Sequence, residues 1–153
     1  AVHGIDLTRY ITGLGISKTV GARCWNGFAT EEKNFKDCAQ FMAKLENGAG
    51  LIADVSYSVP DSIGYNLPLY WNFQLWGSKG LATFSASSNG VTLYKNGNKK
   101  EEIVHGVDVK SSYLTDLISD INGGENIILN TAEAIRTTRE TLEVQALADR
   151  TEK

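Results

Sequence analysis

The sequence predicts an α+β domain in which an open, largely antiparallel (mixed) β-sheet carries helices on one face. Three observations lead to this class. Apolar and polar residues alternate strictly on both sides of Asn47-Gly48, which is typical of an antiparallel sheet with one wet face. Asn-Gly recurs at 26, 47, 89, 96 and 122, and this dipeptide favours hairpin turns. Helical periodicity occurs only near the two ends of the chain, so the strands follow one another without helical crossovers.

The first predicted element is a helix at 5–15. Its expected apolar face consists of Leu7, Tyr10, Ile11 and Leu14. Asp6 is the expected N-cap, and Gly13 marks the end. A glycine-containing stretch, 13–18, superficially resembles a phosphate loop. However, it follows a helix and opens a strand, whereas a dinucleotide fingerprint follows a strand and opens a helix.

The predicted strands fill the middle of the chain. A strand at 16–25 ends at Asn26-Gly27, and two alternating strands flank Asn47-Gly48. The inner face of these two strands comprises Phe41, Ala43, Leu45, Leu51, Ala53, Val55, Tyr57 and Val59. Four more strand candidates lie at 69–77, 80–86, 91–95 and 100–106.

Two helices are predicted to close the chain. The first, at 111–124, places Leu114, Leu117, Ile118 and Ile121 on one stripe and ends at Gly123-Gly124. The second, at 130–150, begins with a capping-box pattern, Asn130 followed by Glu133. Residues 1–153 are therefore expected to form a single domain.

Composition excludes several classes of protein. A net charge of −3 with dispersed Lys and Arg gives no basic footprint for nucleic acid. The sequence contains no run of about 18 apolar residues, so no membrane span is predicted. With only two histidines and no clustered His/Cys pattern, we expect no metal site. Cys24 and Cys38 are read as free thiols, which favours the cytoplasm, although one disulfide stays open as an alternative.

His3 and Asp6 form the first candidate site, because the spacing H-x-x-D places both side chains on one turn at a helix start. An imidazole there can accept or donate a proton at a bound hydroxyl. The alternative is that His3 is a frayed terminal residue and Asp6 a simple cap.

A second candidate is the loop after Val55, whose tyrosines and polar groups suit a sugar or polyol. Tyr57 and Tyr65 are its expected substrate-binding residues. An ordinary surface loop with two packed tyrosines is the alternative.

The predicted strand at 69–76 carries aromatic residues on both faces. One face comprises Tyr70, Asn72, Gln74 and Trp76. Because large exposed apolar patches mark interfaces, we expect this face to form contacts between copies of the chain, unless a long loop covers it.

Four stretches together resemble the C-terminal domain of the glucose–fructose oxidoreductase/inositol dehydrogenase family. They are VHGIDLTRYITG, FMAKLENGAGLIADVSYSVP, FQLWGSKGLATFS and TAEAIRTTRETLEVQALADR, and they extend over almost the whole chain. The first is the most specific, because the family has an aspartate, three residues, a histidine, and then I-D with a short helix.

The resemblance implies an NAD- or NADP-dependent oxidoreductase that acts on a sugar, polyol or derivative. His3 matches the motif histidine, which would orient or deprotonate the reacting hydroxyl, and Asp6 matches the acidic position after it. The motif aspartate, the Rossmann fingerprint and the family's lysine lie outside this sequence. These 153 residues are therefore expected to be a substrate-binding and oligomerisation domain that binds no cofactor and is inactive alone. The expected assembly is a dimer or tetramer.

Two other functions remain open at this stage. The chain could be a stand-alone, non-catalytic binding or assembly module of the same fold. It could also be a non-redox relative, similar to biliverdin reductase or a scaffold, in which His3 is unused.

Overall fold

The computed structural model describes residues 1–60, 62–63, 70–109, 112–124, 128 and 130–151. Within them the chain forms three helices and two open antiparallel sheets, so the predicted α+β class is confirmed. The elements are α1 (Val2–Thr12), β1 (Ile16–Trp25), β2 (Cys38–Leu45), β3 (Gly50–Ser56), β4 (Phe73–Gly77), β5 (Gly80–Phe84), β6 (Val91–Lys95), β7 (Glu102–Val104), α2 (Tyr113–Ile121) and α3 (Thr131–Thr151).

The chain forms two compact units. The first comprises Ala1–Ser58 and Ser111–Lys153, and the second comprises Val59–Lys110. We expected one open sheet from the sequence, whereas the structure describes a separate sheet in each unit. That residues 1–153 form one domain stays a prediction.

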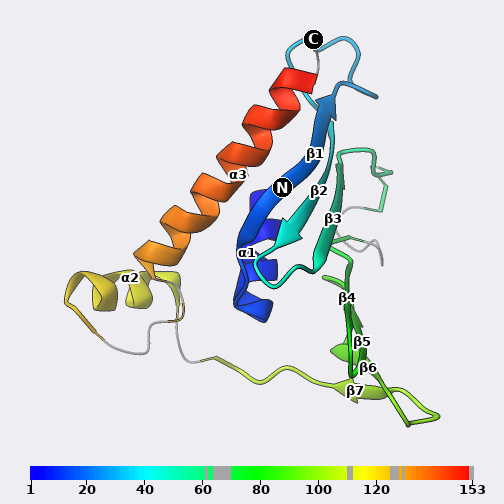
Figure 1. Ribbon diagram of the computed structural model, residues 1–153, viewed down its shortest axis with the longest axis vertical. Helices are drawn as coiled ribbons and strands as arrows, with labels where there is room; N and C mark the ends of the chain where they lie inside the picture. Colours follow the sequence, from blue (N-terminus) through cyan, green and yellow to red (C-terminus); the bar gives the residue numbers. More distant parts are fainter. Residues whose placement is uncertain (61, 64–69, 110–111, 125–127, 129, 152–153) are drawn as a thin grey trace. The chain divides into compact units, whose positions relative to one another are not determined.

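The first unit is a three-stranded sheet covered on one face by α1 and α3 (Figure 1). The strand order is β1-β2-β3, with Asn47-Gly48 joining β2 to β3 as predicted. Gly48 has a φ of 89°, which glycine adopts without steric cost. The alternation in β2 is confirmed, because Phe41, Ala43 and Leu45 are buried while the residues between them are exposed.

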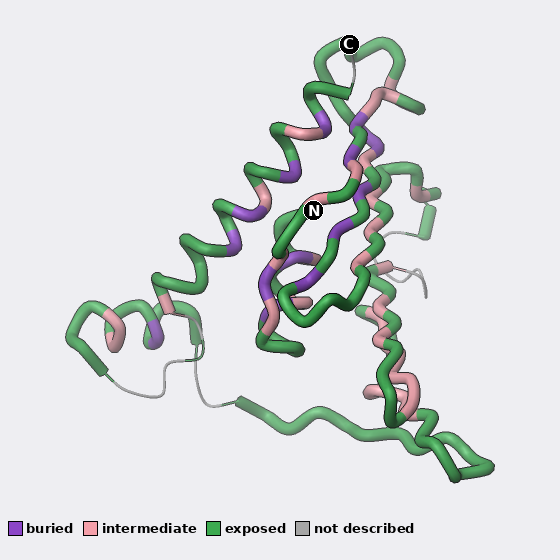
Figure 2. Tube along the Cα trace, in the orientation of Figure 1, coloured by how far each residue is buried: buried purple, intermediate pink, exposed green. Residues whose placement is uncertain are grey.

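The core lies between this sheet and the helices, where Figure 2 shows the buried residues facing one another. It contains Ile5, Ala22, Cys24, Phe41, Ala43, Val144 and Ala148. Both cysteines are free. Cys24 and Cys38 point to opposite faces, because Cys24 pairs with Ala39 while Cys38 pairs with Trp25.

The first helix differs from its prediction at two points. It begins at Val2, so Asp6 lies inside the helix and is not its N-cap; Ala1 holds that position without a side-chain hydrogen bond. The predicted apolar face is also wrong, because Ile5 and Arg9 are buried while Tyr10 and Ile11 are exposed. The predicted end is confirmed, since Gly13 is the C-cap with a φ of 70°.

The second unit is an antiparallel sheet with the order β4-β5-β6-β7. Asn96-Gly97 joins β6 to β7, and Asn89-Gly90 directly precedes β6, as the Asn-Gly pattern predicts. The Asn-Gly at 122 instead ends α2, with Asn122 as the C-cap.

Candidate functional site

His3 lies in the first turn of α1 and its side chain is exposed. The sequence placed it ahead of the helix, but the helix already begins at Val2. A group in the first turn lies at the positive end of the helix dipole. The exposed His3 imidazole is open to solvent. At this position it can exchange a proton with a bound hydroxyl.

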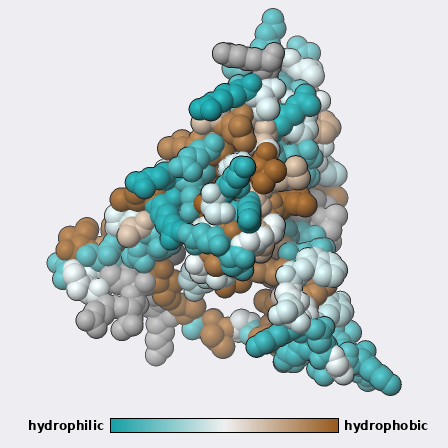
Figure 3. Space-filling view, in the orientation of Figure 1, coloured by the Kyte–Doolittle hydropathy of each residue, from teal (hydrophilic) through white to brown (hydrophobic). Residues whose placement is uncertain are grey.

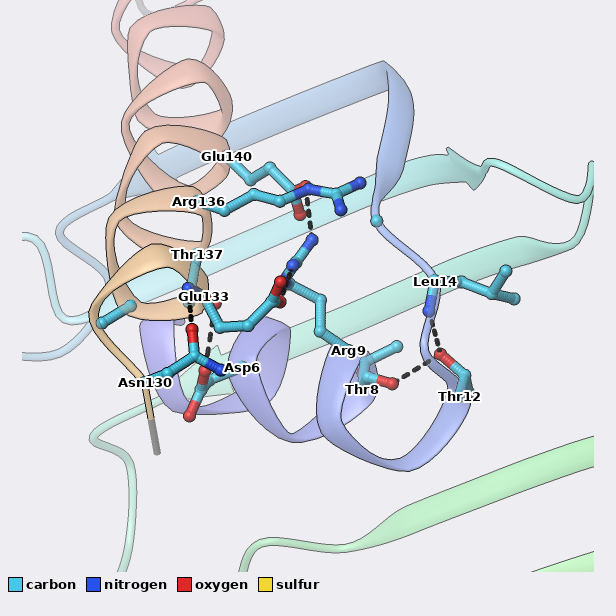
Figure 4. Close-up of polar contacts among 12 residues, drawn as sticks. Asp6, Thr8, Arg9, Thr12, Leu14, Asn130, Glu133, Arg136, Thr137 and Glu140 are labelled. Atoms are coloured by element: carbon cyan, nitrogen blue, oxygen red, sulfur yellow. Dashed lines mark hydrogen bonds and ion pairs between the residues drawn. The ribbon is translucent and has the colours of Figure 1, made fainter. Parts of the chain in front are cut away.

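Asp6 lies one turn further along and faces α3. Its Oδ1 accepts a hydrogen bond from the Thr137 hydroxyl at 3.0 Å. Figure 4 shows this contact between the middle of α1 and the N-terminal part of α3. Asp6 therefore helps to attach α1 to α3, in addition to any role toward a ligand.

Arg9, three residues after Asp6, also faces α3. It is only 6% exposed, and its Nη1 donates to Glu140 Oε1 at 2.8 Å. Its Nη2 also pairs with Glu133, on the first turn of α3 (Figure 4). Burying an arginine requires such carboxylate partners, because an unpaired buried charge is strongly destabilising.

The same group of charges reaches the turn after β2. Arg136 pairs with Glu46 and lies 3.4 Å from Glu140 Oε1. Glu46 also accepts the Gly15 N–H at 2.9 Å, and this hydrogen bond, helped by Arg136, lowers the pKa of Glu46. A Cβ at position 15 would lie 2.5 Å from Arg136 Nη2 and 2.7 Å from Glu140 Oε1, so a larger residue there would displace the ends of these two side chains.

These contacts define an outward face of α1. Side chains seven positions apart lie nearly above one another on a helix, so His3 and Tyr10 share the side turned away from Ile5 and Arg9, and Asp6 lies between the two sides. Tyr10 is exposed. Sequence analysis missed Tyr10 as a candidate because it assigned the residue to the core, although its spacing of seven from His3 was a usable signal.

Tyr57 lies far from this face. Asp6 contacts Thr137, whereas Ala22 of the sheet accepts from Thr151, fourteen residues further along α3. At 1.5 Å per residue, that is about 21 Å. Tyr57 follows the strand end beyond Ala22, so within one chain Tyr57 and Asp6 do not converge on one small ligand. Tyr65 lies outside the described residues.

A buried carboxylate organises the end of the sheet where Tyr57 lies. Asp37 accepts hydrogen bonds from the N–H groups of Gly27, Phe28 and Ala29 at 2.6–2.8 Å. These bonds lower the pKa of Asp37 to about 2. The Tyr57 N–H donates to the Asp37 carbonyl, and the Tyr57 ring lies 5.3 Å from that of Phe35. The only sequence signal for this loop was its Asn-Gly start.

The candidate contact face in the second unit is smaller than predicted. β4 begins at Phe73, so Tyr70 and Asn72 lie before the strand. Gln74 and Trp76 share one face of β4, and Trp76 is 78% exposed. Its cross-strand neighbour is Leu81, which in turn pairs with Tyr94. Trp76, Leu81 and Tyr94 thus form one row across this face.

The fold of this chain matches that of several solved structures. No family model and no curated protein matches the sequence. Among solved structures, a candidate oxidoreductase from Thermotoga maritima matches with a TM-score of 0.78 and 21% identity, over 97% of this chain and 43% of its own. UDP-N-acetylglucosamine 3-dehydrogenase GnnA from Acidithiobacillus ferrooxidans matches with a TM-score of 0.69 and 17% identity, over 97% and 46%. The chain shares their fold.

A third match extends the same picture. Aldose–aldose oxidoreductase from Caulobacter crescentus matches with a TM-score of 0.69 and 15% identity, over 98% of this chain and 44% of its own. The chain therefore spans less than half the length of each of these structures. No described helix combines the length and apolarity needed to cross a membrane.

Proposed function

We propose that this chain is the substrate-binding and oligomerisation domain of an NAD- or NADP-dependent oxidoreductase of the glucose–fructose oxidoreductase/inositol dehydrogenase family. The observation that carries the proposal is the match of 96–98% of the chain to part of larger oxidoreductases. Two of these are named for reactions on sugars, which supports a sugar, polyol or derivative as the substrate class.

The described residues do not fit a nicotinamide cofactor. A dinucleotide site needs a strand, a glycine-rich turn and then a helix. Here Gly13 and Gly15 follow α1 and lead into β1, which is the reverse order. NAD or NADP would therefore be held by another part of the parent protein, and this chain alone would be inactive.

Proton handling at the substrate is the part of the reaction that this chain can perform. His3 would accept the proton of the reacting hydroxyl, or return it in the reverse direction. Asp6 would accept a hydrogen bond from a neighbouring hydroxyl while it holds α1 on α3. Arg9, through its pairs with Glu133 and Glu140, holds α1 on α3 with His3 turned outward.

Exposed sheet faces support assembly into a homo-oligomer. In the first unit, the outer face of the sheet carries Met42 and its cross-strand partner Ile52, which is 80% exposed. In the second unit, Gln74 and Trp76 lie on an exposed face. Apolar side chains on open sheet faces are typical of contacts between subunits. The cytoplasm is the proposed compartment, which agrees with the two free thiols.

The test uses the full-length parent and compares His3→Ala with His105→Ala, which removes the other histidine. Activity is measured with NAD and NADP against a panel of aldoses, polyols and nucleotide sugars. Loss of a general acid–base group costs roughly 10²- to 10⁴-fold, so His3→Ala should lose that much turnover while His105→Ala keeps the wild-type rate. Unchanged turnover in His3→Ala would refute the role of His3. A parent reading frame without a nucleotide-binding half would instead favour the stand-alone module.

A further inference from the structure

Each Asn-Gly step in this chain can modify itself. The glycine N–H proton passes to solvent, an N–Cγ bond forms to the asparagine side chain, the Cγ–Nδ2 bond breaks, and the amide takes up a proton and leaves as ammonia. Water then opens the succinimide ring, which gives aspartate or isoaspartate. Because glycine has no side chain to shield its nitrogen, Asn-Gly favours this reaction. The five steps begin at positions 26, 47, 89, 96 and 122.

Three of the five steps are held on both sides of the bond that would form. The Gly27 N–H donates to the Asp37 carboxylate at 2.7 Å, and the Asn26 side-chain amide donates to two backbone carbonyls. At Asn47-Gly48 and Asn122-Gly123, the glycine N–H donates to the carbonyl three residues back, and the asparagine side chain is hydrogen-bonded as well. These hydrogen bonds have to break before the glycine nitrogen can attack.

Asn96-Gly97 is held through its side chain. The Asn96 Nδ2 donates to the Ser78 carbonyl at 2.8 Å. This step lies in the exposed turn between β6 and β7, where Figure 3 shows hydrophilic atoms at the lower right. It is therefore a solvent-exposed comparison, with a fixed amide, for the step that precedes β6 in the same sheet.

Asn89-Gly90, directly before β6, is held on neither side. In the part of the chain that the structure describes, neither the Asn89 side chain nor the Gly90 N–H makes a hydrogen bond. Both residues border an open hollow of about 700 Å³, so water reaches them. A Cβ on Gly90 would lie 2.6 Å from the Val104 carbonyl oxygen, so a larger residue that would hinder the attack does not fit there.

His105 adds a hydrogen bond that favours the attack. Its Nδ1 lies 2.7 Å from the Asn89 carbonyl oxygen, and because a carbonyl oxygen only accepts, Nδ1 carries the proton and donates it. When the Gly90 nitrogen loses its proton, negative charge spreads onto this same oxygen, since the nitrogen and the carbonyl share one conjugated peptide unit. A donor that already points at the oxygen where charge develops stabilises that charge. His105 therefore makes the Gly90 nitrogen easier to deprotonate.

We propose that Asn89-Gly90 is a self-modification site, which converts to aspartate or isoaspartate in the folded protein ahead of the other four Asn-Gly steps, with His105 as the assisting donor. Either product adds a negative charge next to His105. Isoaspartate also adds a methylene to the main chain at the start of β6, where Val91 pairs with Val104. The modification therefore changes the charge of the second sheet and the pairing of β6 with β7.

The test incubates the full-length protein at neutral pH and follows all five steps by peptide mass spectrometry, which detects the replacement of an amide by a carboxyl group. Asn26, whose glycine reacts only after local opening, should convert at least about tenfold more slowly than Asn89. In urea, where the turns are lost, the five steps should convert at similar rates. His105→Ala should lower the ratio of the Asn89 rate to the Asn96 rate about twofold to tenfold, which is the effect of one hydrogen bond. Because Asn96 belongs to the same sheet, this ratio corrects for any loosening of the sheet in the variant.

Three results would overturn the proposal or its parts. Faster conversion of any other Asn-Gly step in the folded protein would overturn the assignment to Asn89. The same order of rates in urea would also overturn it, because the difference would then come from neighbouring residues in the sequence and not from the fold. An unchanged or higher ratio in His105→Ala would overturn the role of His105.

Discussion

At the scale of single residues, charged side chains do much of the structural work in this chain. Asp37 is 2% exposed and holds three consecutive backbone N–H groups of the loop after β1. Arg9 is similarly buried, between two carboxylates of α3. Both groups make these contacts only in the folded state, so each has a measurable effect on stability.

The carboxylate of Asp37 predicts acid sensitivity. The pKa of Asp37 is about 2 in the folded protein and 3.8 where these interactions are absent. The unfolded state therefore binds the proton first as the pH falls. The stabilisation is therefore complete above pH 3.8 and is lost as the pH drops toward 2. Denaturant unfolding between these values should show falling stability in the wild type and a flatter profile in Asp37→Asn. Asp54→Asn, at an exposed position, serves as the control. An Asp37→Asn variant whose stability falls with pH as steeply as that of the wild type would contradict the prediction.

The buried pair of Arg9 and Glu140 predicts a non-additive effect. Arg9→Met leaves the Glu140 carboxylate buried without its main partner, which costs about 3–5 kcal/mol of unfolding free energy. Replacing both, as Arg9→Met with Glu140→Leu, should recover much of that loss. The half-exposed Arg136→Met should cost no more than about 1 kcal/mol. Urea unfolding measures all three, and equal losses in the single Arg9 and Arg136 variants would be evidence against the burial of Arg9.

At the scale of elements, strict alternation made the strands around Asn47-Gly48 predictable. The first helix was harder, because its buried face includes Arg9. Local periodicity treats arginine as a surface residue, and its partner Glu140 lies 131 positions away. Asp6 was misassigned as the N-cap because the helix already begins at Val2, and its contact with Thr137 is also 131 positions distant. Contacts of this kind follow from the packing of α1 on α3 and leave no signal in either segment.

Neighbouring positions of β2 provide a matched test of its two faces. Phe41 is buried beneath the helices, whereas Met42 points to the open face. Phe41→Ala should cost about 3–5 kcal/mol of unfolding free energy through the cavity that it leaves. Met42→Ala should leave the unfolding free energy of the subunit nearly unchanged. Similar losses at both positions, measured by urea unfolding, would contradict the one-sided core.

At the scale of the whole molecule, the sequence indicated the fold class, but not what covers each exposed surface. The open sheet faces carry exposed apolar or aromatic side chains, among them Ile52 and Trp76. What covers such a face does not follow from a pattern within these 153 residues, because alternation along a strand indicates that a side chain points outward and not what it contacts. The proposed function assigns the sheet faces to contacts between copies of the chain.

Assembly through the open sheet face predicts a specific dissociation. Ile52→Asp places a charge on that face, in the outer strand β3, and should lower the mass measured by light scattering, while the circular dichroism spectrum stays unchanged. Lys99→Asp, in the exposed turn between β6 and β7, adds a charge elsewhere and should leave the mass unchanged. An oligomer that survives Ile52→Asp would exclude this face as the interface.

The division of labour between the two halves is tested most directly by fluorescence titration with NADH and NADPH. The 153-residue chain and the full-length parent are titrated side by side. The account predicts saturable binding of one of these cofactors to the parent and none to the chain alone. Tight binding by the chain itself would contradict it, because the cofactor would then have a site among residues that are assigned here only to substrate and subunit contacts.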